Sequence, residues 1–362
     1  MSGPLKIGLI GAGRISGRHV EAAGQFPDRL RFAAVCDVDE SAARTRAGEA
    51  GAAELYRDGL ELIRDADVEA VDICTLADTH AQYAIAAAEA GKHVLIEKPM
   101  AATMRQCRDI VSACEKSGVT LMVAQNQRYK ANYRAVRRAI REGQIGEVRS
   151  VRVESLGHTQ SAPGHWIYDA RRAGGGVVMT LAVHRIDLAR YFVGEIRRVT
   201  AICRTTRPEF VHGAEDWAWA LMEFANGAVG ELFTTWSAYR MPWGESFIIF
   251  GQRGTVHALP VLVSYREPAL IASDRHWAPP PANRSDKTWK TRGFVPLQPD
   301  AEGLPTGEMY VDEVLHFADC CATGQPPISS GRDNLGTMRT VFGIYEAARR
   351  GATVDLDEVC PL

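Results

Sequence analysis

The sequence lacks the features that mark several large classes of protein. No apolar run approaches the roughly 18 residues that cross a bilayer, and Ile7–Gly13 is too short and too rich in glycine for a signal-peptide core. The 42 basic and 44 acidic side chains give a net charge of −2, so no global field attracts nucleic acid or anionic lipid. We therefore expect a cytoplasmic protein with neither a nucleic-acid nor a membrane partner.

Cysteine spacing also gives no signal for a metal or redox site. The eight cysteines are dispersed apart from Cys320–Cys321, and none has the C-x-x-C spacing of a zinc ribbon or redox dithiol. They are expected to be reduced thiols, mostly in the core, and no metal site is predicted. The 362 residues are 46% hydrophobic and 24% charged, which is typical of a globular chain long enough for two domains or one large α/β unit.

The first third of the chain predicts a doubly wound parallel sheet. From residue 5 to about residue 124, short β-branched runs alternate with longer helical patterns, as in repeated βαβ units. Helices are expected at 79–90 and 104–116. Strands are expected at Lys6–Ile10, Arg31–Cys36, Ala70–Thr75, His93–Ile96 and Thr120–Val123.

The pattern changes beyond Gln127, where a second domain begins. Antiparallel sheet is expected to dominate there, because Asn226–Gly227 between two alternating runs is a strong hairpin signal. Residues 260–307, with three successive prolines, are expected to be surface loop with one or two short strands. The expected helices are 131–142, which is basic and amphipathic, 177–192, 310–321 and 335–350, and the expected strands are 147–155, 199–204 and 217–224.

A glycine-rich turn follows the first strand and precedes a helical pattern. In Gly11-Ala12-Gly13-Arg14-Ile15-Ser16-Gly17, Gly11 permits the tight turn and Gly13 lets the backbone approach a pyrophosphate. Ser16 replaces the third glycine with a small side chain. Asp37 ends the next strand, where it would accept hydrogen bonds from the adenosine ribose and repel a 2′-phosphate. NAD is therefore favoured over NADP, the alternatives being an ordinary turn and, for Asp37, a helix N-cap.

Three further segments are expected at the carboxyl ends of the strands, where doubly wound sheets bind ligands. They are 74–80, 97–99 and 125–129. Pro99 biases Lys98 toward an extended conformation, so the lysine can be held at the edge of the sheet. A solvated surface turn is the alternative for this segment taken alone.

Taken together, these residues resemble the Gfo/Idh/MocA oxidoreductase family. The resemblance covers residues 5–258 and 308–356, and its most specific part is the Glu97-Lys98-Pro99 context. Further matches are Gly11-Ala12-Gly13 with His19, Asp37, Val71-Asp72-Ile73, Gly174–Gly176, His184, Asp187 and Glu215-Asp216.

The resemblance implies an α/β fold: an N-terminal Rossmann doubly wound parallel sheet, residues 1–125, and a C-terminal α/β domain with a large, mostly antiparallel open sheet, residues 126–362. It also implies hydride transfer between NAD and a sugar, cyclitol or related polyol, in a homodimer or homotetramer. Lys98 matches the catalytic lysine and His184 the proton-transferring histidine. The expected cofactor-binding residues are Gly11, Gly13, Arg14, Ile15, Asp37, Thr75, Leu76, His80, Glu97, Lys98 and Gln125.

The sequence departs from the family pattern at Thr180, which stands where relatives carry an aspartate four residues before the histidine, and at Leu76, where many carry proline. Threonine supplies a hydroxyl but no carboxylate to stabilise an imidazolium, so we expect it to bind substrate or fix the imidazole tautomer. Asp187, three residues after His184, could orient the ring instead. The alternative for Asp187 is a capping or salt-bridging carboxylate.

Substrate contacts depend on loops and are predicted from chemistry alone. An apolar ring face beside hydroxyl partners suits a polyol pocket. A glycosidase-like enzyme that retains its NAD and a non-catalytic NAD-linked sensor are the alternative functions. The expected substrate-binding residues are Lys98, Arg128, Tyr129, His165, Trp166, Asp187 and His184, with Tyr168 and Asp169 as further candidates.

Overall fold

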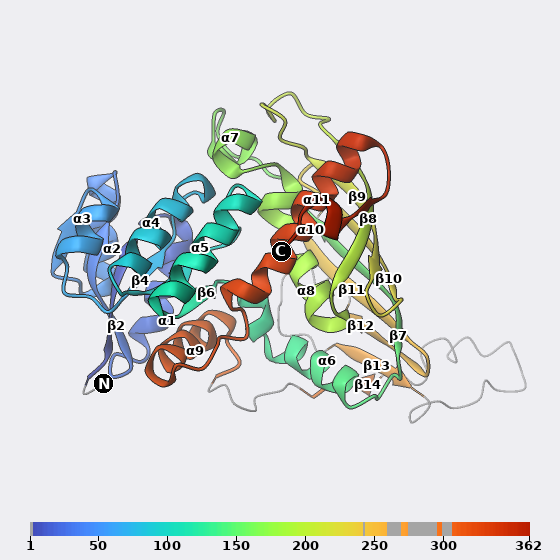
Figure 1. Cartoon of the computed structure of the whole chain (residues 1–362), viewed down its shortest axis with the longest axis horizontal. Coiled ribbons are helices and arrows are strands. Elements are labelled where there is room, and N and C mark those ends of the chain that lie inside the picture. Colours follow the sequence, from blue (N-terminus) through green and yellow to red (C-terminus); the bar gives the residue numbers. More distant parts are fainter. Residues whose placement is uncertain (1–2, 242, 259–268, 274–294, 299–305) are drawn as a thin grey trace, which may run out of the picture.

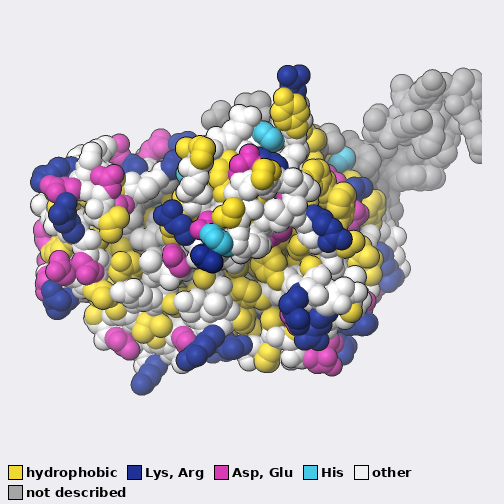
Figure 2. Space-filling view, turned by 90° about the horizontal axis from the view of Figure 1, so that it is seen from above, with side chains coloured by type: hydrophobic (Ala, Val, Ile, Leu, Met, Phe, Trp, Pro, Cys, Tyr) yellow, Lys and Arg dark blue, Asp and Glu magenta, His cyan; other side chains and the backbone are white. Residues whose placement is uncertain are grey.

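The computed structural model describes residues 3–241, 243–258, 269–273, 295–298 and 306–362. They form two lobes, each built on one β-sheet, and the C-terminal helices lie between and beneath them (Figure 1). Acidic and basic side chains are interspersed on the face seen in Figure 2, in keeping with the small net charge. Within the described part of the chain, no helix combines the length and apolar character needed to cross a bilayer.

The first sheet confirms the predicted Rossmann arrangement. Its six strands are all parallel, in the order β3-β2-β1-β4-β5-β6. The strands are β1 (Leu5–Ile10), β2 (Leu30–Cys36), β3 (Glu54–Tyr56), β4 (Ala70–Ile73), β5 (His93–Ile96) and β6 (Leu121–Val123), and the helices are α1 (Arg14–Gly24), α2 (Glu40–Ala50), α3 (Gly59–Asp65), α4 (Ala77–Glu89) and α5 (Met104–Ser117).

Two details of this sheet differ from the prediction. Strand β3 was not expected, because its three residues at the sheet edge are half-buried or exposed and form no apolar run. Strand β4 ends at Ile73 rather than Thr75, so the two following residues lie in the turn above the sheet.

The core beneath the first sheet is completed from the far end of the chain. Helix α9 (Met309–Thr323) lies beside α1 (Figure 1). Its residues Val311, Val314 and Phe317 are buried in one hydrophobic cluster with residues of β1 and α1. A helix that follows the second lobe in sequence therefore packs as part of the first.

The second sheet has nine strands in the order β14-β13-β12-β11-β7-β10-β9-β8-β15, antiparallel at every pair except β10 with β7. The predicted hairpin is confirmed, since Gly227 has a φ of 85° between β9 and β10. The strands are β7 (Val148–Leu156), β8 (Ile196–Arg204), β9 (Trp217–Phe224), β10 (Val229–Thr235), β11 (Gly244–Gly251), β12 (Gly254–Ala258), β13 (Leu270–Ser273), β14 (Val295–Pro296) and β15 (Val354–Asp355).

Helices cover the face of this sheet that is turned toward the first lobe (Figure 1). They include α6 (Ala131–Arg141), α8 (Val183–Val193) and α10 (Gly331–Arg350), with short α11 (Leu356–Val359). Short α7 (Ala170–Ala173) instead contacts α4 of the first lobe. The opposite face exposes large apolar side chains, including Leu221 and Ile202, which are 62% and 55% exposed. Most of the loop predicted at 260–307 lies outside the described residues, apart from β13 and β14.

Candidate functional site

The glycine turn after β1 is shaped by contacts that exclude larger side chains. Gly11 has a φ of 101°, and a Cβ there would lie 2.7 Å from the backbone carbon of Cys74. At Gly13, by contrast, no atom beyond its two chain neighbours lies within 4 Å of the position that a Cβ would take. Ser16 is buried, and its hydroxyl donates to the Gly13 carbonyl at 2.7 Å. The turn therefore leaves open space beside the N-terminus of α1, where free N–H groups favour an anion.

Asp37 lies against this turn, at the carboxyl end of β2. Its carboxylate accepts hydrogen bonds from the backbone N–H of Ala12 at 2.7 Å and of Asp39 at 2.8 Å. Asp39, not Asp37, caps α2, so the alternative assignment of Asp37 as the N-cap of that helix is wrong. The carboxylate is fixed beside the glycine turn, where a ribose would lie in a dinucleotide-binding sheet.

The turns after β4 and β5 are joined by a buried histidine. One ring nitrogen of His80 lies 3.1 Å from the Thr75 carbonyl, and the other lies 3.0 Å from the Pro99 carbonyl. Burial lowers the pKa of His80, and its contacts with the backbone carbonyls oppose this effect. The structure thus brings Thr75, Leu76 at the N-cap of α4, and the Glu97–Pro99 turn to one edge of the sheet.

The segment after β6 presents unpaired amide groups at the same edge. Gln125 Nε2, Asn126 Oδ1 and Gln127 Oε1 are buried, and none has a hydrogen-bond partner in the described part of the chain. Buried polar atoms are rarely left without partners. The open space at Gly13 and these unpaired amide atoms fit a dinucleotide that extends along this edge and hydrogen-bonds to them.

Lys98 reaches from the first lobe to the second. Its half-buried side chain donates to the carbonyl of Thr180 at 3.2 Å. Burial lowers the pKa of Lys98, and the charge of Arg14 adds to this effect, while Glu97 and Glu245 oppose it. The lysine is therefore a hydrogen-bond donor held at the junction of the two lobes.

The backbone before His184 is set by the Gly174–Gly176 turn. A Cβ at Gly176 would lie 2.0 Å from the Glu215 carbonyl oxygen, so only glycine fits. The Glu215 carboxylate accepts from the N–H groups of Gly176 and Val178 at 2.9 and 2.8 Å. Burial raises the pKa of Glu215 to about 7. The predicted helix 177–192 is instead two pieces, a π-helical turn at Val178–Ala182 followed by α8.

His184 stands on the first turn of α8, one turn beyond the Lys98 contact. Its imidazole is buried, and Nδ1 has no hydrogen-bond partner in the described residues. Burial lowers the pKa of His184 well below its ordinary value, and the positive charges of Lys98, Arg185 and Lys130 lower it further. The ring is therefore neutral and able to accept a proton.

The hydroxyl of Thr180 is already used within the fold. It donates to the Gly176 carbonyl at 2.8 Å and accepts from Trp236 Nε1 at 3.0 Å. Its proton is therefore not directed at His184, whose tautomer it does not fix. The missing carboxylate is not replaced at this position.

Asp187 does not replace that carboxylate either, so its assignment as the group that orients His184 is wrong. Its two oxygens accept hydrogen bonds from Arg128 at 2.7 Å, and one also accepts from Thr337 at 2.9 Å. Asp187 is 1% exposed in this network. The salt-bridging alternative is the one that the structure supports.

Sequence reasoning missed a charged cluster that surrounds His184. Glu245 on β11 lies 3.2 Å from Arg185 Nη2 and 3.9 Å from Lys130 Nζ, and it accepts from Gln127 at 3.1 Å. Burial lowers the pKa of Lys130 to about 7. The 125–129 segment pointed toward Gln127 and Lys130, but no motif marks Glu245.

The remaining predicted substrate contacts lie in other settings. Tyr129 is fully buried, with its hydroxyl 3.3 Å from that of Ser329. His165 and Trp166 are half-buried neighbours at the start of a short 3-10 helix, Trp166–Tyr168, with ring centroids 5.5 Å apart. Tyr168 is buried, and Asp169 caps α7 and bonds His212. Among the described residues, no hydrogen bond joins any of these side chains to Lys98.

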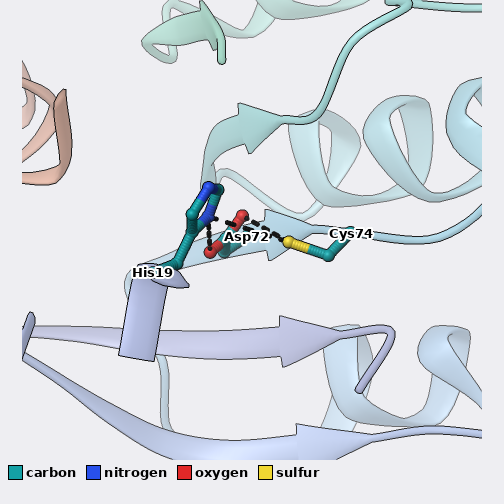
Figure 3. A group of neighbouring side chains, drawn as sticks. All are labelled: His19, Asp72 and Cys74. Carbon is teal, nitrogen blue, oxygen red and sulfur yellow. Dashed lines mark hydrogen bonds and ion pairs between the residues drawn. The ribbon is translucent and has the colours of Figure 1, made fainter. Parts of the chain in front are cut away.

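A polar cluster lies inside the first lobe, below the glycine turn. His19 on α1 points toward Asp72 on β4, 2.8 Å from its carboxylate, and toward Cys74 (Figure 3). Although burial opposes it, the charge of Asp72 raises the pKa of His19. Burial also raises the pKa of the Cys74 thiol, which donates to Asp72. A protonated thiol is a poor metal ligand, so these three donors bond one another, and the absence of a metal site stays a prediction.

Comparisons with known proteins agree with this architecture. A family model described as an oxidoreductase family with an NAD-binding Rossmann fold matches residues 5–125. A second model, for the GFO/IDH/MocA C-terminal domain, matches residues 133–257. Together these two matches span more than half of the chain.

Two relatives match along nearly the whole sequence. Myo-inositol 2-dehydrogenase of Thermotoga maritima is 27% identical over 98% of this chain and 99% of its own. D-apiose dehydrogenase of Paraburkholderia graminis is 30% identical over 96% of this chain and 88% of its own. Among solved structures, levoglucosan dehydrogenase in complex with NADH superposes with a TM-score of 0.84 at 28% identity, covering 98% of this chain and 99% of that one.

Proposed function

We propose that this chain, which belongs to the Gfo/Idh/MocA family of NAD-binding oxidoreductases, interconverts a secondary alcohol and a ketone on a sugar, cyclitol or related polyol. The relatives are named for inositol, apiose and levoglucosan, which are all polyhydroxylated molecules. In this proposal residues 1–125 hold the cofactor, and residues 126–362 hold the substrate and join the subunits.

One observation carries the assignment of the reacting groups. Lys98, from the turn after β5, donates to the backbone one turn before His184, so the two lobes place an ammonium and a neutral imidazole together. A proton acceptor beside a positively charged donor is what alcohol oxidation requires.

The cofactor would lie over the glycine turn, with Gly11, Gly13, Arg14 and Ile15 at its pyrophosphate and Asp37 at its ribose. Thr75, Leu76, His80, Glu97 and Gln125 would line its remaining length. NAD, when bound, supplies the hydride acceptor for the carbon that is oxidised.

Lys98 would hydrogen-bond the substrate oxygen and offset the negative charge that develops on it. His184 would take the hydroxyl proton onto its imidazole as the carbonyl forms. The cations around His184 disfavour the resulting imidazolium, so the proton must pass onward to water. In the reverse direction the same groups return the proton to the ketone oxygen.

The proposal is tested by mixing the purified protein with NAD and a panel of inositols, aldoses and anhydro sugars, and following absorbance at 340 nm. NADH should form with at least one alcohol and be consumed with the matching ketone. No change in either direction across the panel would contradict the proposal. Cofactor that co-purifies and never exchanges would favour the glycosidase-like alternative instead.

We also propose that the outer face of the second sheet pairs with a second copy of the chain. The rings of Trp219 and Phe233 stack there with centroids 3.9 Å apart, and Trp219 remains 48% exposed. The same face carries both signs of charge, as in the Arg198–Glu223 pair at 3.1 Å. A patch that exposes apolar rings beside charges of both signs suits a two-fold interface.

Light scattering should give a mass of at least twice the 39.6 kDa of one chain, and Leu221→Glu should reduce it. A monomer at micromolar concentration would contradict this proposal. A cytoplasmic location is part of the same proposal, and it is supported by the eight cysteines, which are all free thiols.

A further inference from the structure

Helix α1 carries a fully buried histidine that the proposed reaction does not use. His19 is 0% exposed and lies in the second turn of the helix. Its Nδ1 is 2.8 Å from the Asp72 carboxylate (Figure 3), and its Nε2 is 3.5 Å from the Glu97 carboxylate. A third carboxyl group, that of Glu313 on α9, lies 4.0 Å from Nε2. One imidazole therefore faces acidic groups from β4, from the turn after β5 and from α9.

The groups around His19 favour a protonated ring. Cys74 Sγ lies 3.7 Å from Nδ1, and the centroid of the Tyr310 ring lies 6.2 Å from that of the imidazole. Although burial opposes it, the charge of Asp72 raises the pKa of His19 well above its usual value. Burial raises the pKa of the Cys74 thiol and the pKa of the Glu313 carboxyl group, which favours the uncharged form of both. The ring is therefore an imidazolium.

The Glu97 carboxylate joins this imidazolium to the turn that carries Lys98. Its Oε1 faces His19, and its Oε2 accepts from the backbone N–H of Lys98 at 2.9 Å. Although burial would raise it, the pKa of Glu97 is lowered, because His19 and the charge of Lys98 favour the ionised form. An ionised carboxylate is a stronger acceptor than a neutral one. The imidazolium therefore strengthens the contact that holds the backbone of Lys98.

We propose that His19 is a positioning residue for Lys98, which it holds in place through the ionised Glu97 carboxylate. The inference rests on the proposed function, in which Lys98 donates to the reacting oxygen. The ammonium of Lys98 spans the lobes to the Thr180 carbonyl at 3.2 Å, so a shift of its backbone changes its placement relative to His184. The charge of Glu97 also opposes the lowering of the pKa of Lys98 by burial, which favours the ammonium form. His19 thus links the helix of the dinucleotide turn to the reacting ammonium.

The first test is His19→Gln, which keeps a polar side chain beside Asp72 but removes the positive charge. Its kcat for alcohol oxidation should fall about tenfold, because a small misplacement of a reacting group is costly. Its KM for NAD should change by less than about twofold, since the glycine turn and Asp37 remain. A merely structural defect in α1 would act in the opposite way, because this helix begins at the glycine turn. A raised KM for NAD with an unchanged kcat would therefore overturn the proposal.

Glu97→Gln tests the same link from the carboxylate. Because it removes a negative charge beside Lys98, the lysine loses its proton at lower pH, and the alkaline limb of the kcat profile should move down by about one pH unit. His19→Gln should move this limb in the same direction, because Glu97 takes up a proton more readily without the imidazolium. The double variant His19→Gln/Glu97→Gln should lose no more kcat than the more impaired single variant. Additive losses, or an unmoved alkaline limb in Glu97→Gln, would overturn the proposal.

Glu313→Gln is the matched control within the same buried cluster. Neither oxygen of Glu313 has a hydrogen-bond partner among the described residues, and burial favours its uncharged form. Glutamine has nearly the shape of that uncharged group, so kcat and its pH profile should equal those of the unmodified protein. Equal losses of kcat in Glu313→Gln and His19→Gln would overturn the proposal, because the cluster would then act only through packing.

Two further measurements separate this inference from the proposed function. In ¹³C NMR of histidine-labelled protein, the signal that is missing from His19→Gln should be that of an imidazolium at about pH 7. A neutral ring there would overturn the proposal without any turnover. Circular dichroism reports the folding of each variant, and Glu97→Gln carries the test if His19→Gln does not fold. If the unmodified protein oxidises an alcohol and His19→Gln matches its kcat, the positioning role fails while the proposed function stands.

Discussion

The two lobes build their parts of the site in different ways. In the first lobe, the glycine turn and Asp37 act through the backbone of neighbouring strands, within about one βαβ unit. In the second, the environment of His184 is made by side chains from the turn after β6, from β10's end and from β11. A backbone conformation that only certain residues can adopt fixes the residue types nearby, so the cofactor contacts could be predicted from the sequence. A pocket assembled from side chains that are distant in the sequence could not.

The largest expected effect is at the residue that joins the lobes. Lys98→Met should lower kcat by about 10³, because it removes a preorganised donor from the reacting oxygen. The KM for NAD should change little, since the glycine turn and Asp37 remain. Steady-state kinetics with the concentrations of NAD and alcohol both varied measures kcat and the KM for NAD separately. A variant that lost NAD affinity but kept kcat would place Lys98 with the cofactor only.

His184→Asn should lower kcat by about 10² and leave NADH fluorescence titrations unchanged. Asparagine keeps a polar side chain of similar size but cannot take the proton. The variant should bind substrate with nearly the original affinity, which product-inhibition measurements can show. Activity within a factor of two of the unmodified protein would exclude His184 as the proton acceptor.

Asp37→Ala tests the first lobe alone. It should raise the KM for NAD about tenfold and reduce the preference over NADP, because a carboxylate that repels a 2′-phosphate is gone. The value of kcat at saturating NAD should be unaffected. An unchanged NAD/NADP ratio would show that the carboxylate serves only the backbone of Ala12 and Asp39.

Lys130→Met should change how the rate of alcohol oxidation depends on pH, with an effect of a few-fold. The pKa of Lys130 is about 7, so its charge is lost as pH rises through neutrality. The pKa of His184 then rises, and the imidazole becomes a stronger base. Alcohol oxidation should therefore increase across pH 7 in the unmodified protein, and Lys130→Met should remove that step. A step retained in this variant would assign it to another group.

Thr180→Asp should have the smallest effect, an increase in kcat of a few-fold. A carboxylate would stabilise the His184 imidazolium. The variant also loses the hydroxyl that donates to the Gly176 carbonyl, which reduces the gain. Thr180→Asn is the control, because it supplies no charge. If the two variants turn over at the same rate, the pocket does not need the carboxylate that relatives carry.

Much of the fold could be predicted because periodicity and turn residues report local structure. The parallel sheet and the Asn226–Gly227 hairpin are confirmed in this way. Strand β3 was missed because three residues at an edge show no period. The π-helical turn was also missed, and the carboxylate bonded to the N–H groups at its start belongs to Glu215, nearly forty residues away.

Predictions about the candidate site also failed where a contact depends on residues that are distant in the sequence. The wrong role for Asp187 followed from assuming that helical spacing decides contacts. The carboxylate is instead drawn to Arg128, an ion pair that nothing in the spacing marks. Glu245 was not predicted from the sequence because its partners, Gln127, Lys130 and Arg185, come from two other parts of the chain.

Helix α9 has a consequence for how the protein is made. Its apolar side chains complete the cluster under β1, yet they leave the ribosome after residue 308. A nascent chain that has finished its first six strands therefore still exposes the flank that α9 will cover. We therefore expect the dinucleotide-binding half to complete its core only when nearly the whole polypeptide has been synthesised.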